Sequence, residues 1–161
     1  MKEIWIANDH GGYELKRRFL SYFGENNIPF VDIGSDSTDI VRYPYYAAKV
    51  AHAVSTGATD RGILICSTGI GMSVVANKHK GVRASLCTNS LHARLTREHN
   101  NSNILCLGGK ITGETLCLDI LDIWLNTEYI GGRHDISLGL LQEAEDSLCN
   151  PVEWIPKNPG L

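Results

Sequence analysis

A cysteine stands where an apolar run gives way to small polar residues and glycines. The stretch ICSTGIGMS runs from Ile65 to Ser73 and places Cys66 at the junction. A thiol at the start of a helix or beside a cation loses its proton more easily than a free thiol, and the thiolate can act as a general base or a nucleophile. We therefore expect Cys66 to be partly ionised near neutral pH. A single cysteine is more often a small apolar filler of the core, so this pattern alone leaves both interpretations open.

The residues after the cysteine have the composition of an anion cradle. Gly69 and Gly71 would let backbone N–H groups approach an oxyanion or a phosphate closely, and a helix beginning there would add positive potential. The spacing matches neither the P-loop nor the dinucleotide-binding glycine pattern. A two-glycine turn is often only a tight connection between a strand and a helix, so the function of this loop depends on its neighbours.

Three further stretches, NDHGG, REHNNSN and GGRH, carry side chains capable of acid–base or anion chemistry. Each also has a structural interpretation: a helix N-cap by the aspartate, a solvated turn, and the charged start of a helix. The candidates that these stretches supply are Asp9, His10, His99, Asn100, Arg133 and His134.

The chain alternates between β-rich runs and stretches with helical spacing of apolar residues. The β-rich runs cover residues 4–8, 30–34, 62–67, 82–87 and 103–109. Strands that are apolar on both faces and separated by helices predict a Rossmann-like parallel five-stranded sheet inside a three-layer α/β/α sandwich. In such sheets the ligand crevice lies beyond the carboxyl ends of the strands, and Asp9, Cys66 and Lys110 all fall there.

The sequence predicts one domain over residues 1–148, ending in a helix over about 134–148, and a C-terminal arm over 149–161. The arm contains three prolines, so it cannot stay helical for long and is expected to lie extended against this or a neighbouring subunit.

Charge and cysteine usage exclude several classes of function. The net charge of −3, without a run of lysine and arginine long enough to mark a nucleic-acid or anionic-membrane footprint, predicts no nucleic-acid partner and no membrane partner. No apolar run reaches the roughly 18 residues of a membrane span. The cysteines lack CxxC and Cys/His metal spacing, which favours a reduced, cytoplasmic location and predicts no metal site. They are Cys66, Cys87, Cys106, Cys117 and Cys149.

As an ordered set, these stretches resemble the ribose-5-phosphate isomerase B family, which also includes the subunits of galactose-6-phosphate isomerase. The resemblance runs from Lys2 to about Glu145, through DHGGYELK, YPYYA, GILICSTGIGMSVVANK, GVRA, REHNNSNILCLGG and GGRH. It implies aldose–ketose isomerisation of a phosphorylated sugar through a cis-enediolate, without a metal or an organic cofactor. In that chemistry one modest base and stabilisation of a developing oxyanion suffice.

The resemblance also implies roles for individual residues. The family uses as base either a cysteine at the strand end or a glutamate further along the glycine loop, and Met72 occupies the glutamate position here, which selects Cys66. Asp9 is implied to bind a sugar hydroxyl and Thr68 to shuttle a proton, while His99, aided by Asn100, opens the furanose ring. The remaining implied substrate contacts are His10 near the phosphate, Tyr43 closing the pocket, and the backbone of the loop that includes Ser67, Gly69, Ile70, Gly71 and Ser73.

The departures from the family pattern cluster at the phosphate end. Ser137 stands where a second arginine is expected after Arg133, and Lys110 replaces an arginine after the fifth strand. Arg42 stands where an acidic residue is more usual and is a candidate compensating cation. Ribose 5-phosphate is the first expected substrate. Four- and six-carbon sugar phosphates, an unphosphorylated ligand, a non-catalytic sugar-phosphate-binding subunit of a hetero-oligomer and a flavodoxin-like nucleotide binder are the alternatives.

The order of the elements predicts how the site is assembled. His99 and Asn100 precede the fifth strand, whereas Cys66 ends the third, so a parallel sheet places them at opposite ends of one chain. If both groups serve one reaction, a second subunit must complete the site. An isologous dimer provides two such sites, so we predict a homodimer or a larger even assembly.

Overall fold

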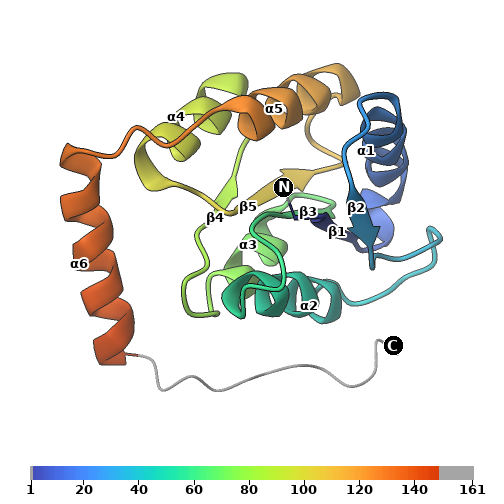
Figure 1. Cartoon of the computed structure of the whole chain (residues 1–161). Helices are drawn as coiled ribbons and strands as arrows, with labels where there is room; N and C mark the ends of the chain where they lie inside the picture. Colours follow the sequence, from blue (N-terminus) through green and yellow to red (C-terminus); the bar gives the residue numbers. More distant parts are fainter. Residues whose placement is uncertain (1, 149–161) are drawn as a thin grey trace.

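The computed structural model describes residues 2–148 (Figure 1), so the predicted arm over 149–161 and Cys149 lie outside the described residues. Within residues 2–148 the chain forms a five-stranded parallel sheet in the order β2-β1-β3-β5-β4. The strands are β1 (Ile4–Asn8), β2 (Phe30–Asp32), β3 (Gly62–Cys66), β4 (Ala84–Leu86) and β5 (Ile104–Gly108).

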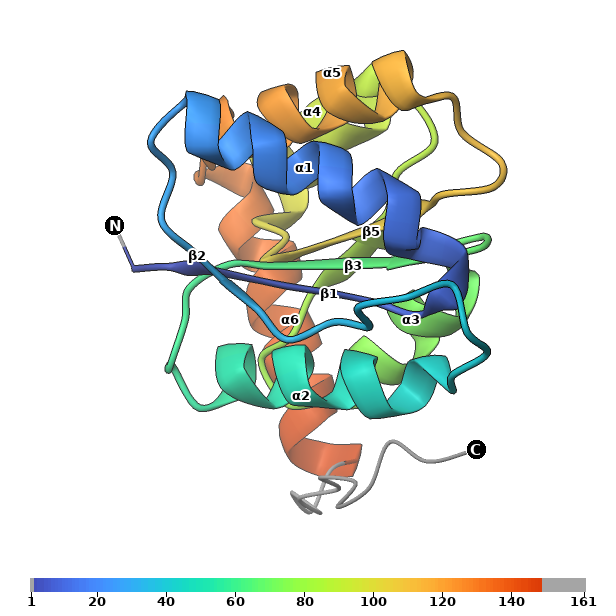
Figure 2. The ribbon, with the colours of Figure 1, turned by 90° about the vertical axis from the view of Figure 1, so that its right-hand side faces the viewer.

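Helices cover both faces of the sheet, which confirms the predicted three-layer α/β/α sandwich. Figure 2 shows α1, α4 and α5 on one side of the sheet and α2 and α3 on the other. A short 3-10 helix, η1 (His10–Gly12), leads into α1. The helices are α1 (Tyr13–Glu25), α2 (Tyr43–Ser55), α3 (Ile70–Ala76), α4 (Ser90–Asn100), α5 (Glu114–Asn126) and α6 (Arg133–Leu148).

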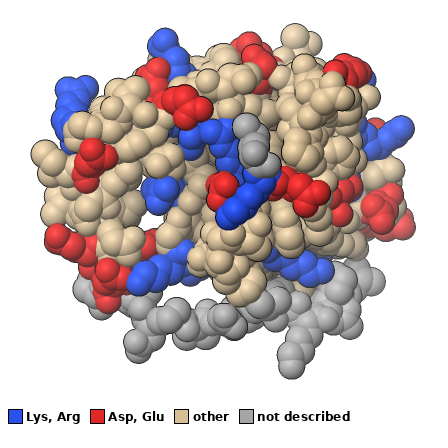
Figure 3. Space-filling view, viewed as in Figure 1, with Lys and Arg blue, Asp and Glu red and all other residues tan. Residues whose placement is uncertain are grey.

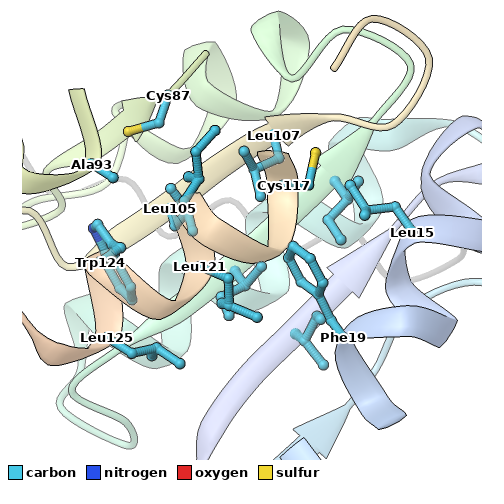
Figure 4. Close-up of a cluster of buried hydrophobic side chains, with 14 of the residues drawn as sticks. Leu15, Phe19, Cys87, Ala93, Leu105, Leu107, Cys117, Leu121, Trp124 and Leu125 are labelled. Atoms are coloured by element: carbon cyan, nitrogen blue, oxygen red, sulfur yellow. The ribbon is translucent and has the colours of Figure 1, made fainter. Parts of the chain in front are cut away.

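The central strands β3 and β5 are buried along their whole length, as their continuous apolar runs predicted. Successive side chains of a strand point to opposite faces, so each strand contributes to two separate cores. Ile65 and Leu105 pack with Phe19 and Trp124 beneath α1, α4 and α5 (Figure 4). On the other face, Leu64, Cys66 and Cys106 pack beneath α2 and α3, together with Met72.

The two edge strands are shorter than predicted. In β2, the Asp32 carboxylate accepts a hydrogen bond from Gly34 N at 2.9 Å, which turns the backbone out of the strand. Before β4, Val82 N donates to His79 O at 3.1 Å in a turn, so the strand begins later than the apolar pattern indicated. Edge strands pair on one side only, and local side-chain hydrogen bonds therefore decide where they end.

The last helix, α6, stands apart from the sandwich (Figure 1). It contacts the body near its ends: the His134 ring stacks on His99, and the Glu145 carboxylate accepts hydrogen bonds from Gly81 N at 3.0 and 3.1 Å. Between these contacts, Ile136 and Leu140 are 70% and 61% exposed. No helix within residues 2–148 combines the length and the apolar character needed to cross a membrane.

Candidate active site

Three strand-to-helix connections meet at the carboxyl end of the sheet. An added Cβ at Gly11 would lie 2.1 Å from Ser67 Oγ, and one at Gly109 would lie 2.9 Å from Gly11 O. Gly109 N donates to Cys66 O at 2.8 Å, and Lys110 N donates to Ser67 O at 3.0 Å. The connections after β1, β3 and β5 therefore form one surface, as the positions of their polar residues predicted.

Cys66 is the last residue of β3 and is 5% exposed. Its Sγ accepts a hydrogen bond from Gly69 N at 3.0 Å. The N–H of Gly69 is therefore a hydrogen-bond donor directed at the sulfur atom from the loop that follows the strand. The cysteine is thus both part of the core and equipped with a donor that a purely apolar filler does not need.

Burial keeps three other cysteines protonated at neutral pH. It raises the pKa of Cys87 to about 12 and that of Cys117 to about 11, and it raises the pKa of Cys106 well above its ordinary value. Among the cysteines of residues 2–148, Cys66 alone lies at the carboxyl end of the sheet with an N–H donor on its sulfur.

The backbone N–H groups of the loop after Cys66 differ in whether they have a hydrogen-bond acceptor. Ile70 N is 3.3 Å from Thr68 Oγ1, and Ser73 N donates to Gly69 O at 3.1 Å. Gly71 N has no acceptor among residues 2–148, as is usual for the first N–H groups of a helix. The N–H of Ser73 is therefore not available to a ligand, and the Ser73 hydroxyl donates to Ile70 O at 2.8 Å. The cradle predicted over residues 67–73 therefore ends before Ser73.

Asp9 and His10 are held in place by different parts of the chain. Asp9 is 5% exposed, and its Oδ1 accepts a hydrogen bond from Gly11 N at 2.8 Å, so the N-cap interpretation is correct. Burial raises the pKa of Asp9, although hydrogen bonds from Gly11 and Gly12 and the charge of His10 oppose the shift. The His10 Nδ1 lies 3.2 Å from Val41 O, which ties the ring to the loop before α2.

The start of α2 covers the glycine loop. An added Cβ at Gly71 would lie 2.7 Å from the Tyr43 ring, so the ring rests on the backbone of the loop. Arg42 is the exposed N-cap of α2, beside the Val41 that holds His10. Lys110 is exposed directly after β5. Two candidate cations therefore lie at the same end of the sheet as Cys66.

A second group of candidate residues lies at the amino end of β5. The ring of His99, from α4, stacks on that of His134, from the start of α6, with centroids 4.3 Å apart and planes 10° apart. Arg133 Nε is 3.5 Å from His134 Nε2. Burial, together with the charges of His99 and Arg133, lowers the pKa of His134. Asn100, the last residue of α4, is exposed beside this group.

One chain cannot bring the two groups together. Gly62 pairs with Ile104 at one end of the sheet and Cys66 pairs with Gly108 at the other. At about 3.3 Å per residue, these ends lie roughly 13 Å apart. His99 and Asn100 therefore lie across the sheet from Cys66, as the order of the elements predicted, and Arg133 lies with them beside His134.

Comparison with known proteins identifies the family. Residues 4–140 match the family of the Ribose/Galactose Isomerase. The chain belongs to this family. Its enzyme class is thereby an isomerase, and the resemblance found from the sequence is confirmed.

Relatives with known names support the same assignment. This isomerase is 42% identical over 134 residues to ribose-5-phosphate isomerase B of Escherichia coli (strain K12), covering 83% of this chain and 90% of that one. The structure of ribose-5-phosphate isomerase B from Clostridium thermocellum matches with a TM-score of 0.89 at 46% identity, over 91% of this chain and 99% of that one. The Mycoplasma genitalium enzyme with bound ribulose-5-phosphate matches with a TM-score of 0.86 at 36% identity, over 89% and 96% of the two chains.

The sequence analysis named His134 as a candidate together with Arg133, but it did not predict the contact of His134 with His99. The stacking of the two rings joins residues of two separate helices, which no spacing within one helix reveals. Among residues 2–148 of the isomerase, no group of three or more His, Cys, Asp or Glu side chains is arranged to hold a metal ion.

Replacing Gly69 with alanine is expected to lower the free energy of unfolding by about 2–4 kcal/mol and to reduce kcat. Gly69 has φ +78°, and an added Cβ would lie 2.5 Å from Leu86 Cδ1 and 2.8 Å from the carbonyl carbon of Leu107. Gly57 is a matched control, because its φ is +76° with nothing within 4 Å of an added Cβ. G57A should cost only about 1 kcal/mol in urea unfolding. Equal losses in both variants would contradict the packing argument.

Replacing Asp9 with asparagine is expected to remove a pH-dependent loss of stability. Burial raises the folded-state pKa of Asp9 above its ordinary 3.8, so the wild type loses stability relative to D9N as pH rises from there through the raised pKa. Asparagine keeps an acceptor for Gly11 N. Urea unfolding of both proteins between about pH 3 and pH 7 measures the difference. A difference that does not change with pH would show that the carboxylate is not destabilised by burial.

Proposed function

We propose that this isomerase interconverts ribose 5-phosphate and ribulose 5-phosphate through a cis-enediolate, with the Cys66 thiolate as the base and without a metal ion. The observation that carries the proposal is the placement of Cys66 Sγ, 3.0 Å from Gly69 N, at the carboxyl end of the sheet beside a loop with unused N–H donors. The relative with bound ribulose-5-phosphate supports the choice of a five-carbon substrate.

The proposed reaction needs one base and one set of oxyanion donors. The Cys66 thiolate removes the proton from carbon 2 of the open-chain aldose and returns it to carbon 1, and the reverse reaction exchanges these carbons. Backbone N–H groups of the loop, including that of Gly71, stabilise the negative charge on the enediolate oxygens. Thr68 moves a proton between the two oxygens, and Asp9 holds a sugar hydroxyl.

We propose that each site is shared by two subunits of a homodimer. His99 and Asn100, which open the ring, and Arg133, which contacts the phosphate, would come from the partner of the chain that supplies Cys66. Exposed apolar side chains support this assembly: Ile136 and Leu140 on α6 are 70% and 61% exposed, and a monomer rarely leaves such a helix face uncovered.

The phosphate is proposed to meet cations from both subunits. His10, Arg42 and Lys110 lie at the carboxyl end of one chain, and Arg133 approaches from the other. Ser137 follows Arg133 by one helical turn on α6, so the missing second arginine removes one charge-assisted hydrogen bond, which is worth about 1.5–3 kcal/mol. Arg42 is proposed to compensate from the opposite side.

Steady-state isomerisation of four-, five- and six-carbon sugar phosphates tests this proposal. We expect kcat/KM for ribose 5-phosphate to exceed that for the other sugars at least about tenfold, because one misplaced hydroxymethylene group costs about 1–3 kcal/mol in a fitted pocket. A tenfold preference for another sugar phosphate would overturn the substrate assignment. A purified chain that binds these sugars and converts none of them would instead favour the non-catalytic subunit.

A further inference from the structure

A second polar pocket opens at the amino end of the sheet, across the molecule from Cys66. Its volume is about 330 Å³, and its walls come from the end of α2 and the segment that leads to β3, the residue before β4, and the end of α4 with the turn that follows it. Three arginines line it: Arg61, Arg83 and Arg97. We call it the arginine pocket.

Each guanidinium of the arginine pocket is fixed by neutral backbone carbonyls. Arg61 Nη1 donates to Leu125 O at 2.6 Å, and Arg97 Nε donates to Thr127 O at 3.2 Å. Arg83 Nε donates to the carbonyls of both Asn100 and Asn101 at 3.0 Å. A guanidinium has five N–H donors, so these bonds hold each group in place while using only part of its capacity.

The pocket holds more positive than negative charge. Among residues 2–148, no ion pair joins Arg61, Arg83 or Arg97 to a carboxylate. Asp60 also lines the pocket, but its carboxylate pairs with Lys2 Nζ at 3.1 Å. Burial, with the positive charges of Arg61 and Arg83, lowers the pKa of Arg97 to about 10, although Glu128 opposes the shift.

The indole of Trp124 fixes the relative positions of two of these cations. The guanidinium carbons of Arg61 and Arg97 lie 5.5 and 5.6 Å from its ring centroid, and the ring itself is fully buried in the core drawn in Figure 4. Stacking on an aromatic face attracts a cation without neutralising it. Both groups are therefore held beside the cavity with their charge intact.

The simpler interpretation is that the arginines only cap the ends of α4 and α5. Capping accounts for the carbonyl contacts, but it does not require three cations to converge on an open cavity without a paired carboxylate. On the face shown in Figure 3, basic and acidic side chains are interspersed. The arginine pocket is thus a local concentration of positive charge, in a chain whose net charge is −3.

We propose that the arginine pocket, which none of the residues assigned to the isomerase site lines, binds a phosphate-class oxyanion of its own. Guanidinium forks match the geometry of phosphate oxygens and bind them with paired, charge-assisted hydrogen bonds. A dianion would offset the charge that the three arginines bring together. The volume of about 330 Å³ admits a phosphate monoester as well as the free ion.

Equilibrium dialysis with radiolabelled inorganic phosphate, at constant ionic strength, tests the proposal on the full chain. The wild type is expected to bind two phosphates per chain, one in the isomerase site and one in the arginine pocket. R61Q should bind one, with at least a tenfold weaker second site, and should keep the wild-type KM for ribose 5-phosphate. R61K should bind the second phosphate more tightly than R61Q and more weakly than the wild type, because lysine keeps the charge and lacks the guanidinium fork.

The control R17Q removes the same charge from the exposed face of α1, where Arg17 is 3.7 Å from Glu14, and should also bind two. R133Q should lose the isomerase-site phosphate and keep the other, which tests the proposed function independently. One phosphate per chain in the wild type, or two in R61Q, would overturn the proposal. If R61Q does not fold, R83Q takes its place and is judged by the number of phosphates bound alone, because Arg83 also holds the carbonyl of Asn100.

Discussion

Replacing Cys66 with alanine is expected to lower kcat for sugar-phosphate isomerisation by about 10³-fold while leaving substrate binding nearly unchanged. The reason is that Cys66 is the proposed base, and Met72, which is buried in the same loop, cannot accept a proton in its place. C66S should be similarly inactive, because its hydroxyl can accept the hydrogen bond from Gly69 N but does not ionise at neutral pH. Exchange of the carbon-bound hydrogen of ribulose 5-phosphate with deuterium oxide should disappear in both variants.

The matched control is C117A, since Cys117 is equally a buried cysteine but lies on α5 beneath the opposite face of the sheet. It should keep the wild-type kcat and lose about 1 kcal/mol of unfolding free energy from the smaller side chain. Hydrogen exchange that persists in C66A would remove Cys66 from the role of base. A comparable loss of kcat in C117A would show that core packing, and not the thiolate, accounts for the effect.

The central part of the fold could be predicted from the sequence because its physical causes are local. The runs that became β3 and β5 consist of apolar residues and one glycine each, as expected of short strands that are covered on both faces. The positive φ of Gly69 is a conformation that glycine adopts without strain, so the turn after Cys66 was also readable from its residue types. These two features fix which residues reach the carboxyl end of the sheet.

Contacts between distant segments could not be predicted in the same way. His10 is held by Val41, 31 residues later, and His99 stacks on His134 from another helix. Neither contact leaves a periodic signal, because each depends on how two elements pack after the chain has folded. The arginine pocket has the same origin, since Arg61, Arg83 and Arg97 belong to three different segments and meet only at the end of the sheet.

The position of Ser73 shows what the glycine-loop motif alone could not predict. The sequence placed Ser73 with the other loop residues, yet its N–H and hydroxyl both bond within the helix, to Gly69 O and Ile70 O. Helix geometry explains the difference: only the first N–H groups lack an acceptor four residues earlier, and Ser73 comes too late in α3 to be among them.

A mixture of two inactive variants is expected to regain activity if each site draws on two subunits. C66A removes the proposed base from one half of a site, and H99N removes the proposed ring-opening group from the other half. In a mixed dimer, one site carries both changes and the other carries neither. After unfolding and refolding together at equal concentration, about half of the dimers are mixed, so about a quarter of the wild-type sites return.

Mixing C66A with D9N is the control, because Cys66 and Asp9 belong to the same half and every site of that mixture keeps at least one change. If the C66A and H99N mixture shows no more activity than the sum of the two separate variants, Cys66 and His99 do not serve the same site. Because the sheet separates the two residues within one chain, they can meet only across two subunits.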